Sequence, residues 1–324
     1  HVLGVLRKAD VPVRDAGDTC VVAGVSERGE RPLVLLAGHL DTVPAQDNLP
    51  GRLDHGAVHG LGAADMKGAL AVMIELLLAG AGGAIDVGAV FFGREELPQA
   101  ESALAPLLAR DPGLRTADLA VVMEPTANTL QLGCLGNINA TWTFRGRSGH
   151  SARPWLADNA LHRAAHGVVA LDAVEAVTHD IGGLEYTEVV SVTMLEGGIA
   201  RNVIPDTAVA QVNYRYPPGL SAPDAAARLA GWCGADGELD IHSNAPSGPV
   251  PEGNPLVEAL RATGELPVAP KQAWTPVAEF GEAGVDAVNF GPGDPPQAHT
   301  RGEHVTGEAL AASYRTLEAF LHVT

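Results

Sequence analysis

Acidic and histidine side chains follow several short apolar runs of this chain. They are, in chain order, His39, Asp41, Asp65, Glu95, Glu96, Glu124 and His299. Imidazole nitrogens and carboxylate oxygens are the ligands that a zinc-like divalent ion takes in proteins. Two such ions that share one carboxylate can together activate a water and polarise a carbonyl group. The pattern therefore predicts a metal site assembled from several loops.

The segment GHLDTVP is the most specific of these motifs. His39 and Asp41 are two residues apart, so on an extended segment their side chains point the same way. His39 can then bind a metal while Asp41 accepts a hydrogen bond from the other ring nitrogen. For this motif alone, a histidine packed in an ordinary loop is the alternative.

The segment GLGAADMKGAL places Asp65 where a helix is expected to begin. One interpretation is an ordinary N-cap preceded by glycines that make the turn. The other is a carboxylate that bridges two metal ions. A phosphate-binding loop is disfavoured, because no GK[ST] sequence follows.

Three further acids follow apolar segments, and a histidine follows a Gly- and Pro-rich loop. Glu95 and Glu96 close FFGREE, Glu124 lies in VMEPT, and His299 follows the Gly- and Pro-rich GPGDPPQ. Adjacent carboxylates can point in different directions, so one can bind metal while the other acts as a general base. For each residue taken singly, an exposed loop position is the alternative, and it is the usual one for paired glutamates.

Polar residues in the middle of the chain are candidates for contacts with a substrate. His150 lies among turn residues in GRSGHSARPW and could donate a hydrogen bond to a developing oxyanion. Arg153, Asn202 and Arg215 lie beside predicted strands and together could clamp a substrate carboxylate. A solvated surface position is the alternative for all four.

The first part of the chain alternates between strand and helix patterns. Apolar runs typical of buried strands cover 32–38, 86–93 and 118–123, and helical patterns cover 66–79 and 100–110. This alternation predicts an α/β sheet with helices on both faces. Ligands of such sheets bind beyond the carboxyl ends of the strands, which is where His39, the Glu95–Glu96 pair and Glu124 fall.

The pattern changes near residue 136. Predicted strands at 139–145, 188–195, 208–216 and 238–242 accompany predicted helices at 159–171 and 221–233. After residue 245 the first pattern returns, with helices at 255–263 and 308–322 and a strand at 286–290. We therefore expect a discontinuous catalytic domain, 1–136 plus 247–324, and an inserted α+β domain, 137–246, with a four-stranded sheet.

Composition narrows the classes of partner. The formal net charge of −18 argues against nucleic acid and anionic membranes. Three widely spaced cysteines form no CxxC pair, so neither a disulfide framework nor a thiolate zinc site is expected. A cytoplasmic location is the default expectation.

No stretch reads as a membrane span, because the apolar run 69–78 is short and contains Glu75. Residues 1–25 lack the basic start and apolar block of a signal peptide. The printed chain begins at His1 rather than at methionine, so this expectation concerns only the printed residues.

Taken in order, these motifs resemble those of the M20 family of metallopeptidases and amidohydrolases, which are co-catalytic zinc enzymes. The resemblance covers nearly the whole chain. It implies a zinc-peptidase-like α/β catalytic domain, with a mixed sheet and helices on both faces, and an inserted ferredoxin-like lid and dimerisation domain. It also implies two divalent ions, with zinc as the first choice and cobalt or manganese as alternatives.

The resemblance also assigns roles to individual residues. The first metal would take His39, Asp65 and Glu124, and the second would take Asp65, Glu96 and His299. Glu95 would be the general base, and Asp41 would orient His39. His150 would enter the active site of the other subunit of a homodimer formed through the inserted domain, and Arg153, Asn202 and Arg215 would recognise the substrate.

Finer features are similar to the actinobacterial members of this family that remove the succinyl group from N-succinyl-LL-2,6-diaminopimelate. They include NLPGRL, HSARPWLADNALH and GGIARNVIPD. Alternatives are a deacylase of N-acetylornithine or an acyl-lysine, a dipeptidase, and a non-catalytic dimeric binding module that retains the fold. Pro276 in WTPVAEF stands where that subfamily often has Asp, which leaves substrate detail in this loop open.

Overall fold

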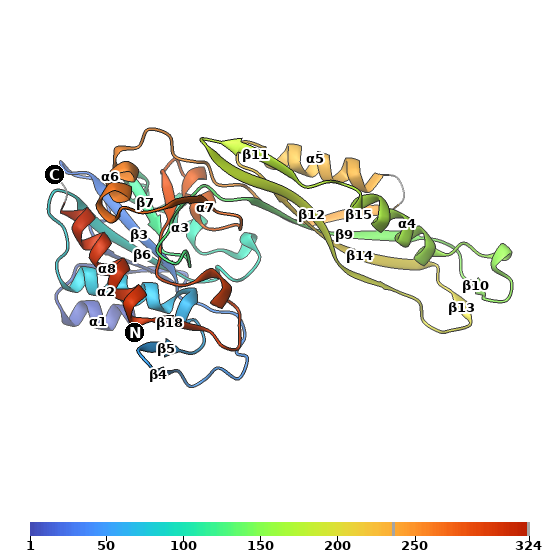
Figure 1. The fold of residues 1–324 in the computed structure, drawn as a ribbon, viewed down its shortest axis with the longest axis horizontal. Helices are drawn as coiled ribbons and strands as arrows, with labels where there is room; N and C mark the ends of the chain where they lie inside the picture. The colour runs from blue at the N-terminus through green and yellow to red at the C-terminus, as the bar shows by residue number, and fades with distance from the viewer. Residues whose placement is uncertain (235–236, 323–324) are drawn as a thin grey trace. The chain divides into compact units, whose positions relative to one another are not determined.

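The computed structural model describes residues 1–234 and 237–322. These residues form two compact units (Figure 1). The first unit comprises residues 1–133, 248–271 and 275–322, and the second comprises residues 134–247 without the undescribed pair, together with 272–274. Each unit is described by itself.

An eight-stranded mixed sheet is the centre of the first unit, in the order β1-β2-β6-β3-β7-β17-β8-β16. Its strands are β1 (Val13–Gly17), β2 (Cys20–Gly24), β3 (Leu33–His39), β6 (Asp86–Phe92), β7 (Leu119–Val122), β8 (Leu130–Leu132), β16 (Val268–Pro270) and β17 (Ala287–Asn289). A small second sheet contains β4 (Arg52–Asp54), β5 (Ala57–His59) and β18 (His304–Thr306). The helices are α1 (Val2–Lys8), α2 (Gly68–Leu78), α3 (Leu104–Arg110), α6 (Pro255–Gly264), α7 (Val277–Glu282) and α8 (Gly307–Leu321).

Apolar side chains cover both faces of the large sheet. Along β3, Val34 and Leu36 pack into a core that includes residues of α1, α2, α6 and α8. The alternate residues Leu33 and Leu35 pack with α3 and α7 on the other face. This explains why β3 is an uninterrupted apolar run. The predicted α/β class, with a mixed sheet and helices on both faces, is confirmed.

Three central strands run parallel, and they determine where the acids lie. β3 pairs in parallel with β6 on one side and with β7 on the other. Their carboxyl ends therefore meet at one edge of the sheet. His39 is the last residue of β3, and the segments after β6 and β7 carry the three glutamates of the predicted site.

The second unit is built on a five-stranded antiparallel sheet in the order β11-β12-β14-β9-β15. Its strands are β9 (Gly136–Arg145), β11 (Val177–Ile181), β12 (Leu184–Gly197), β14 (Thr207–Tyr216) and β15 (Glu238–Ala245). Its helices are α4 (Ala160–Asp172) and α5 (Ala222–Cys233), and β10 (Gly149–His150) pairs with β13 (Val203–Ile204).

The expectation of four strands in this sheet was wrong. The fifth strand, β11, pairs with the first residues of β12 through a hairpin whose turn contains Gly182 and Gly183, both with positive φ. All five residues of β11 are exposed or half-buried. Its sequence VTHDI therefore carries no strong apolar signal by which a strand could be predicted.

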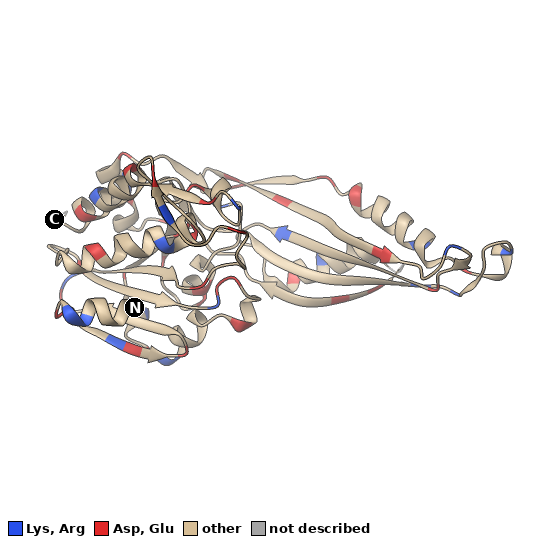
Figure 2. Ribbon diagram, turned by 90° about the horizontal axis from the view of Figure 1, so that it is seen from below, with Lys and Arg blue, Asp and Glu red and all other residues tan. Residues whose placement is uncertain are grey.

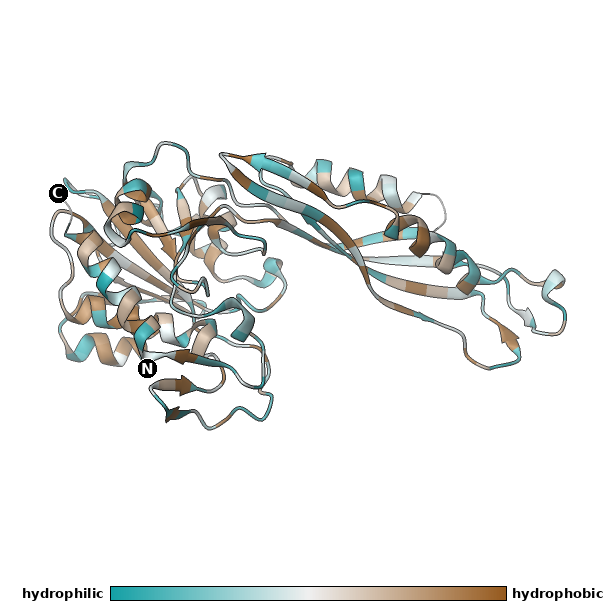
Figure 3. Cartoon of the chain, in the orientation of Figure 1, coloured by the Kyte–Doolittle hydropathy of each residue, from teal (hydrophilic) through white to brown (hydrophobic). Residues whose placement is uncertain are grey.

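The two faces of this second sheet differ in chemistry. Alternate residues of β9 and β14, such as Ile138, Trp142 and Tyr214, are buried in a core with α4 and α5. The other face carries polar side chains, among them Asn137, Asn139 and Asn213, which are joined by hydrogen bonds. The resulting alternation is visible along the long strands in Figure 3.

Residues 272–274 belong to the second unit, although the sequence boundaries assign them to the catalytic domain. Gln272 donates its side-chain amide to the carbonyl of Glu185 at 3.0 Å. The indole of Trp274 donates to the carbonyl of Pro246, also at 3.0 Å. Such long-range hydrogen bonds leave no local signal in the sequence.

Acidic residues outnumber basic ones by 39 to 21, and both kinds are spread over the two units (Figure 2). Within the described ranges, none of the helices has the length and apolar character needed to span a membrane.

Glu279 is a buried acid of α7, on the face of the large sheet that α3 and α7 cover. Its side chain is 2% exposed, and neither carboxylate oxygen has a hydrogen-bond partner among the described residues. Burial raises the pKa of Glu279 to about 7, and the nearby Ser102 hydroxyl opposes part of this rise. The stabilisation from a raised carboxyl pKa is fully present below the unfolded value near 4.5 and is lost as the pH rises through about 7.

Glu279→Gln, which remains neutral, is therefore expected to stabilise the protein at about pH 8 by up to roughly 3 kcal/mol, and far less at about pH 5. Thermal melts of both proteins at the two pH values measure this difference. Glu308→Gln, which changes an exposed acid of α8, serves as the control. An equal change in Tm at both pH values would show that Glu279 does not titrate as described.

Candidate metal centre and active site

The strand ends bring three of the predicted ligands to one place. His39 ends β3 and is 1% exposed. Glu124 follows β7 by two residues and is also buried. Glu95 and Glu96 lie in the bend after β6. Parallel pairing of these strands therefore supplies one imidazole and three carboxylates at the same edge.

One interpretation of the sequence placed Asp65 at a helix N-cap. In the structure Asp65 reaches this edge from a distorted turn instead. It lies in a π-helical turn, Ala63–Lys67, in which Asp65 and Met66 have non-helical backbone angles. The N-cap of α2 is Lys67. This turn directs the Asp65 side chain towards His39, where it is 9% exposed.

The two oxygens of Asp65 face different histidines. Oδ1 lies 2.9 Å from Nε2 of His39, and Oδ2 lies 3.5 Å from Nε2 of His299. His39 Nε2 is also 3.8 Å from Oε1 of Glu124. His299 Nε2 is 3.0 Å from Oε1 of Glu96. Asp65 thus lies between two half-sites, in the arrangement of a bridging carboxylate.

Three groups of side chains at this edge present potential ligand atoms within 4.8 Å of one another. They are His39 with Asp65 and Glu124, Asp65 with Glu96 and His299, and His39 with Glu95 and Glu96. The first two groups share Asp65. They contain the same residues that the family resemblance assigns to the two metals.

The histidines of this cluster are held in their charged form by the acids. Burial would lower the pKa of His39, but the hydrogen bond to Asp65 and the charge of Glu124 raise it to about 10. The hydrogen bond to Asp65 raises the pKa of His299 to about 9. Burial opposes ionisation of Asp65, yet its hydrogen bonds with His299 and His39 hold its pKa well below the ordinary value.

The pKa values of the three glutamates are also raised, which for a carboxyl group favours the neutral form. Burial, reinforced by the charge of Glu124, raises the pKa of Glu95 well above its ordinary value. Burial also raises the pKa of Glu96, and that of Glu124 to about 7. Several acids packed in a buried site disfavour one another's charge, and a bound cation would relieve this repulsion.

The donor set fits a divalent metal. All donors are imidazole nitrogens or carboxylate oxygens, which suit zinc and also cobalt or manganese. Oε1 of Glu124 is buried and has no hydrogen-bond partner among the described residues. A buried carboxylate oxygen without a partner is costly unless a ligand satisfies it.

Asp41 takes a different part in the site from the one predicted. The ring Nδ1 of His39 is 3.1 Å from the backbone carbonyl of Asp41, whereas the nearest carboxylate oxygen is 3.8 Å away. The Asp41 carboxylate instead accepts hydrogen bonds from the backbone amides of Glu95 and Glu96, at 3.3 and 3.2 Å. The carbonyl of Asp41 can thus orient the imidazole, while its side chain positions the two glutamates.

Two residues near the site were not predicted from the sequence. Lys271 is buried, and its ammonium group donates to the carbonyl of Pro125, next to Glu124. Glu303 is a buried acid whose carboxylate contacts the turn that carries Asp65. A lysine in APKQ and an acid in RGEH have no spacing that distinguishes them from surface residues.

His150 lies in the second unit, on the short strand β10. Its ring Nδ1 accepts a hydrogen bond from the backbone amide of Ala152 at 3.0 Å. In a neutral imidazole this leaves the proton on Nε2, which can then act as a donor. The side chain is exposed, so its donor group is available to a ligand.

The three predicted clamp residues all lie in the second unit, but they do not lie together. Arg153 and Asn202 lie close to His150: the amide of Arg153 donates to the His150 carbonyl, and Asn202 accepts from Ser151. Arg215 lies near the opposite end of β14, where it is paired with Asn137 and donates to Asn213 at 3.0 Å. A single clamp made by all three residues of one chain is therefore not formed.

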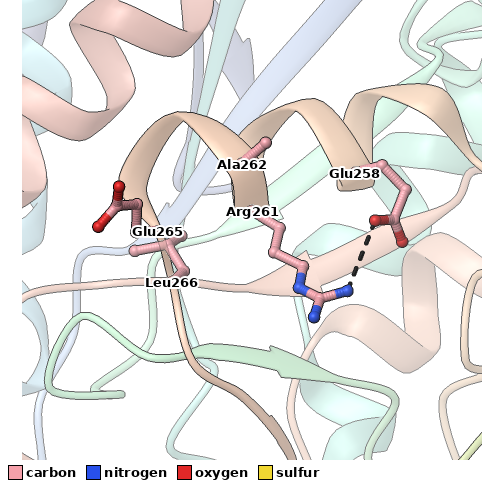
Figure 4. A pocket seen from close by; sticks show the side chains of 5 residues that line it. All are labelled: Glu258, Arg261, Ala262, Glu265 and Leu266. Carbon is pink, nitrogen blue, oxygen red and sulfur yellow. Dashed lines mark ion pairs between the residues drawn. The ribbon is translucent and has the colours of Figure 1, made fainter.

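A pocket on α6 lies apart from this chemistry. Figure 4 shows its lining by Glu258, Arg261, Ala262, Glu265 and Leu266. The Arg261–Glu258 ion pair has an N–O distance of 3.6 Å, and both side chains are more than half exposed. None of these five residues belongs to the candidate metal groups.

Comparison with known families accounts for this arrangement. The family model described as peptidase family M20/M25/M40 matches residues 35–323, which include every residue of the acid and histidine cluster. The chain belongs to this family. Its members are metal-dependent hydrolases of amide bonds, and the chain is therefore such an enzyme.

Several relatives share most of their length with this M20 chain. A protein of Mycobacterium tuberculosis with the provisional name succinyl-diaminopimelate desuccinylase is 38% identical, over 89% of this chain and 82% of its own. A succinyl-diaminopimelate desuccinylase of Corynebacterium glutamicum is 34% identical, over 91% and 82%. An N-acetyl-L-citrulline deacetylase of Xanthomonas campestris is 33% identical, over 95% and 85%.

Solved structures share the fold of this M20 chain at low identity. A tripeptidase of Staphylococcus aureus has a TM-score of 0.79 at 17% identity, over 99% of this chain and 90% of its own. A dinuclear metal-binding peptidase of the M20 family from Bacillus subtilis has a TM-score of 0.67 at 17% identity, over 99% and 90%. At this identity the likeness extends to the fold alone.

Proposed function

We propose that this enzyme removes the succinyl group from N-succinyl-LL-2,6-diaminopimelate, a step towards diaminopimelate and lysine. The observation that carries the hydrolytic part is Asp65, whose two oxygens face His39 and His299 with Glu95 close by. The choice of substrate is supported by the relatives in Mycobacterium and Corynebacterium, whose names state this substrate.

The proposed metal ligands follow from the two groups that share Asp65. His39, Asp65 and Glu124 would hold one ion, and Asp65, Glu96 and His299 would hold the other. Zinc is the first choice for both. Two zinc ions bound there would supply Lewis acidity towards the amide carbonyl and make a water acidic enough to react near neutral pH.

Glu95 is the proposed proton carrier. It belongs to neither of these two ligand groups, and the amide of Glu95 is held by the Asp41 carboxylate. Its carboxylate would take a proton from the attacking water and later give it to the departing amine nitrogen. The position of Glu95 suits this exchange, because a general base must lie within hydrogen-bond reach of the water that it deprotonates, and Glu95 lies beside His39 and Glu96.

We propose that a second copy of the chain completes the active site with His150. Its Nε2–H would donate to the oxyanion of the tetrahedral intermediate, which forms when water adds to the amide carbonyl. Arg153 and Asn202, which lie near His150, would approach the substrate with it. This arrangement does not need Arg215 of the same chain beside them.

The proposed homodimer would use the second unit. β11 covers only Leu184–Glu188 of β12, and the described residues include no strand on the outer edge of 189–197. Met194 and Leu195 on this edge and Val169 on α4 are exposed apolar residues. An unpaired edge beside exposed apolar side chains is suited to pairing with another chain.

A substrate comparison tests the proposed function. Zinc-loaded enzyme would be given N-succinyl-LL-2,6-diaminopimelate, N-acetyl-L-ornithine, N-acetyl-L-citrulline and a dipeptide at equal concentrations. We expect kcat/KM to be highest for the succinyl compound, by at least about tenfold, since a hydrogen bond to a charged group contributes about 1.5 to 3 kcal/mol. A higher value for an acetyl compound would assign the chain to the deacylase alternative, which the Xanthomonas relative favours.

Arg215 is proposed to bind the carboxylate that distinguishes a succinyl from an acetyl group. It is half-buried, and burial lowers the pKa of its guanidinium, although the group remains charged at neutral pH. Arg215→Ala is expected to raise KM for the succinyl substrate by about 10- to 100-fold, and KM for an acetyl substrate much less.

The matched control is Arg145→Ala, which removes an exposed arginine of the neighbouring strand β9. It should leave both KM values unchanged. If Arg215→Ala weakens the binding of both substrates equally, Arg215 does not bind the succinyl carboxylate.

A further inference from the structure

Glu303 is a buried acid placed between the two loops that carry Asp65 and His299. Its side chain is 2% exposed, and it lies directly before β18. Oε2 accepts a hydrogen bond from the amide of Gly62 at 2.8 Å. Oε1 accepts from the amides of Ala64 and Asp65, each at 3.0 Å.

The backbone of this turn needs such an acceptor. Gly62 is left-handed with φ of 76°, and Asp65 and Met66 have non-helical angles. The amides of Gly62, Ala64 and Asp65 are therefore not all paired within a regular helix. Buried amides without acceptors are costly, and one carboxylate here satisfies three of them. A fourth amide, that of Gly60, donates to the backbone carbonyl of Glu303 at 3.0 Å.

The same residue belongs to the turn that carries His299. The amide of Glu303 donates to the carbonyl of Thr300 at 3.3 Å, so Glu303 lies one short turn after His299. Gln46 and Asn48 also donate to this turn, at the carbonyls of His299 and Thr300. Glu303 thus joins the Asp65 turn to the His299 turn directly.

We propose that Glu303 is a positioning residue that sets the separation of Asp65 and His299 and so preforms the second metal site. This inference rests on the proposed two-metal function. Two of the three ligands of the second site, Asp65 and His299, depend on Glu303, whereas only Asp65 of the first site does. His39 and Glu124 are held independently at the ends of β3 and β7.

The selective loss of one metal is the expected consequence of Glu303→Gln. The amide nitrogen of glutamine would face at least one backbone N–H, so a donor would meet a donor. We expect the affinity for the second zinc ion to fall on the order of 10- to 100-fold, as for other residues that orient ligands, while the first ion binds nearly as in the wild type.

Isothermal titration of metal-stripped protein with zinc measures both affinities without any substrate. Glu308→Gln removes an exposed acid five residues away and should titrate as the wild type does. His299→Ala removes a ligand of the second site and should resemble Glu303→Gln, with one tight equivalent. Should Glu303→Gln not fold, Glu303→Asp moves the carboxylate away from the three amides and carries the same expectation.

The outcomes separate the two proposals. If the wild type binds two ions and the Glu303 variant binds both as tightly, Glu303 does not position the second site, and the proposed function is untouched. Equal weakening of both ions would also overturn the inference, because it would indicate general loosening of the turn. If the wild type itself does not bind two ions, the two-metal function fails first.

Discussion

Glu95→Gln is expected to lower kcat for N-succinyl-LL-2,6-diaminopimelate by about 10²- to 10⁴-fold, the range that general acid–base catalysis contributes. The glutamine has the same shape but cannot accept a proton from the attacking water. It belongs to neither proposed metal group, so the protein should still bind two zinc ions. Steady-state kinetics and metal analysis of the same sample measure both quantities.

Glu101→Gln is the matched control, because Glu101 is an exposed acid a few residues further along the same segment. It should keep full activity. Near-normal turnover by Glu95→Gln would remove Glu95 as the general base. Loss of an ion together with activity would instead make Glu95 a ligand, as its proximity to His39 and Glu96 would permit.

Asp65→Asn is expected to weaken the binding of both zinc ions and to lower turnover by at least about 10³-fold, because both proposed sites use its carboxylate. Zinc titration of the stripped variant tests this expectation. His299→Ala, by contrast, should weaken only one ion. A bridging carboxylate differs from an ordinary ligand in that its substitution weakens the binding of both zinc ions.

Asp10→Asn provides the comparison for Asp65→Asn. Asp10 is exposed and has a positive φ, which asparagine tolerates as readily as aspartate. Its titration should match that of the wild type. An Asp65→Asn variant that still binds two ions with unchanged affinity would contradict the bridging role.

The strand-end acids could be predicted from the sequence because their positions follow from a local pattern. PLVLLAG, DVGAVFFG and the run before Glu124 read as buried strands, and the structure forms β3, β6 and β7 from them. Parallel strands have their carboxyl ends at one edge, so side chains far apart in the chain must meet there. The meeting of His39, Glu95, Glu96 and Glu124 at one edge follows from this pattern, whereas their separate roles were assigned from the resemblance to the M20 family.

Other parts of the site depend on contacts that leave no local pattern. The turn around Asp65 reads as a helix start, but its backbone departs from a helix where Glu303, more than two hundred residues later, accepts its amides. Asp41 was predicted to orient His39 with its carboxylate, which the amides of Glu95 and Glu96 occupy instead. Sequence spacing indicates which side chains are near one another and not which atoms pair.

The predicted substrate clamp shows that sequence spacing also does not determine which residues of a sheet lie together. Arg153 and Asn202 lie beside short strands, and Arg215 lies within β14. The register of β14 places Arg215 beside Asn137, while Arg153 and Asn202 lie by β10 and β13. A sequence gives the polar residues of a sheet but not which end of a strand faces a ligand, nor whether a second subunit supplies the missing part.

The most direct test of the central claim is the dependence of succinyl hydrolysis on zinc occupancy. Metal-stripped protein would be reloaded stepwise while bound zinc and the release of succinate from N-succinyl-LL-2,6-diaminopimelate are measured on the same samples. We predict two bound equivalents, with turnover that needs a filled site containing His39, Asp65 and Glu124 and reaches its maximum as the second ion binds. Full turnover without bound metal, or two bound ions with no turnover of this substrate, would contradict the account.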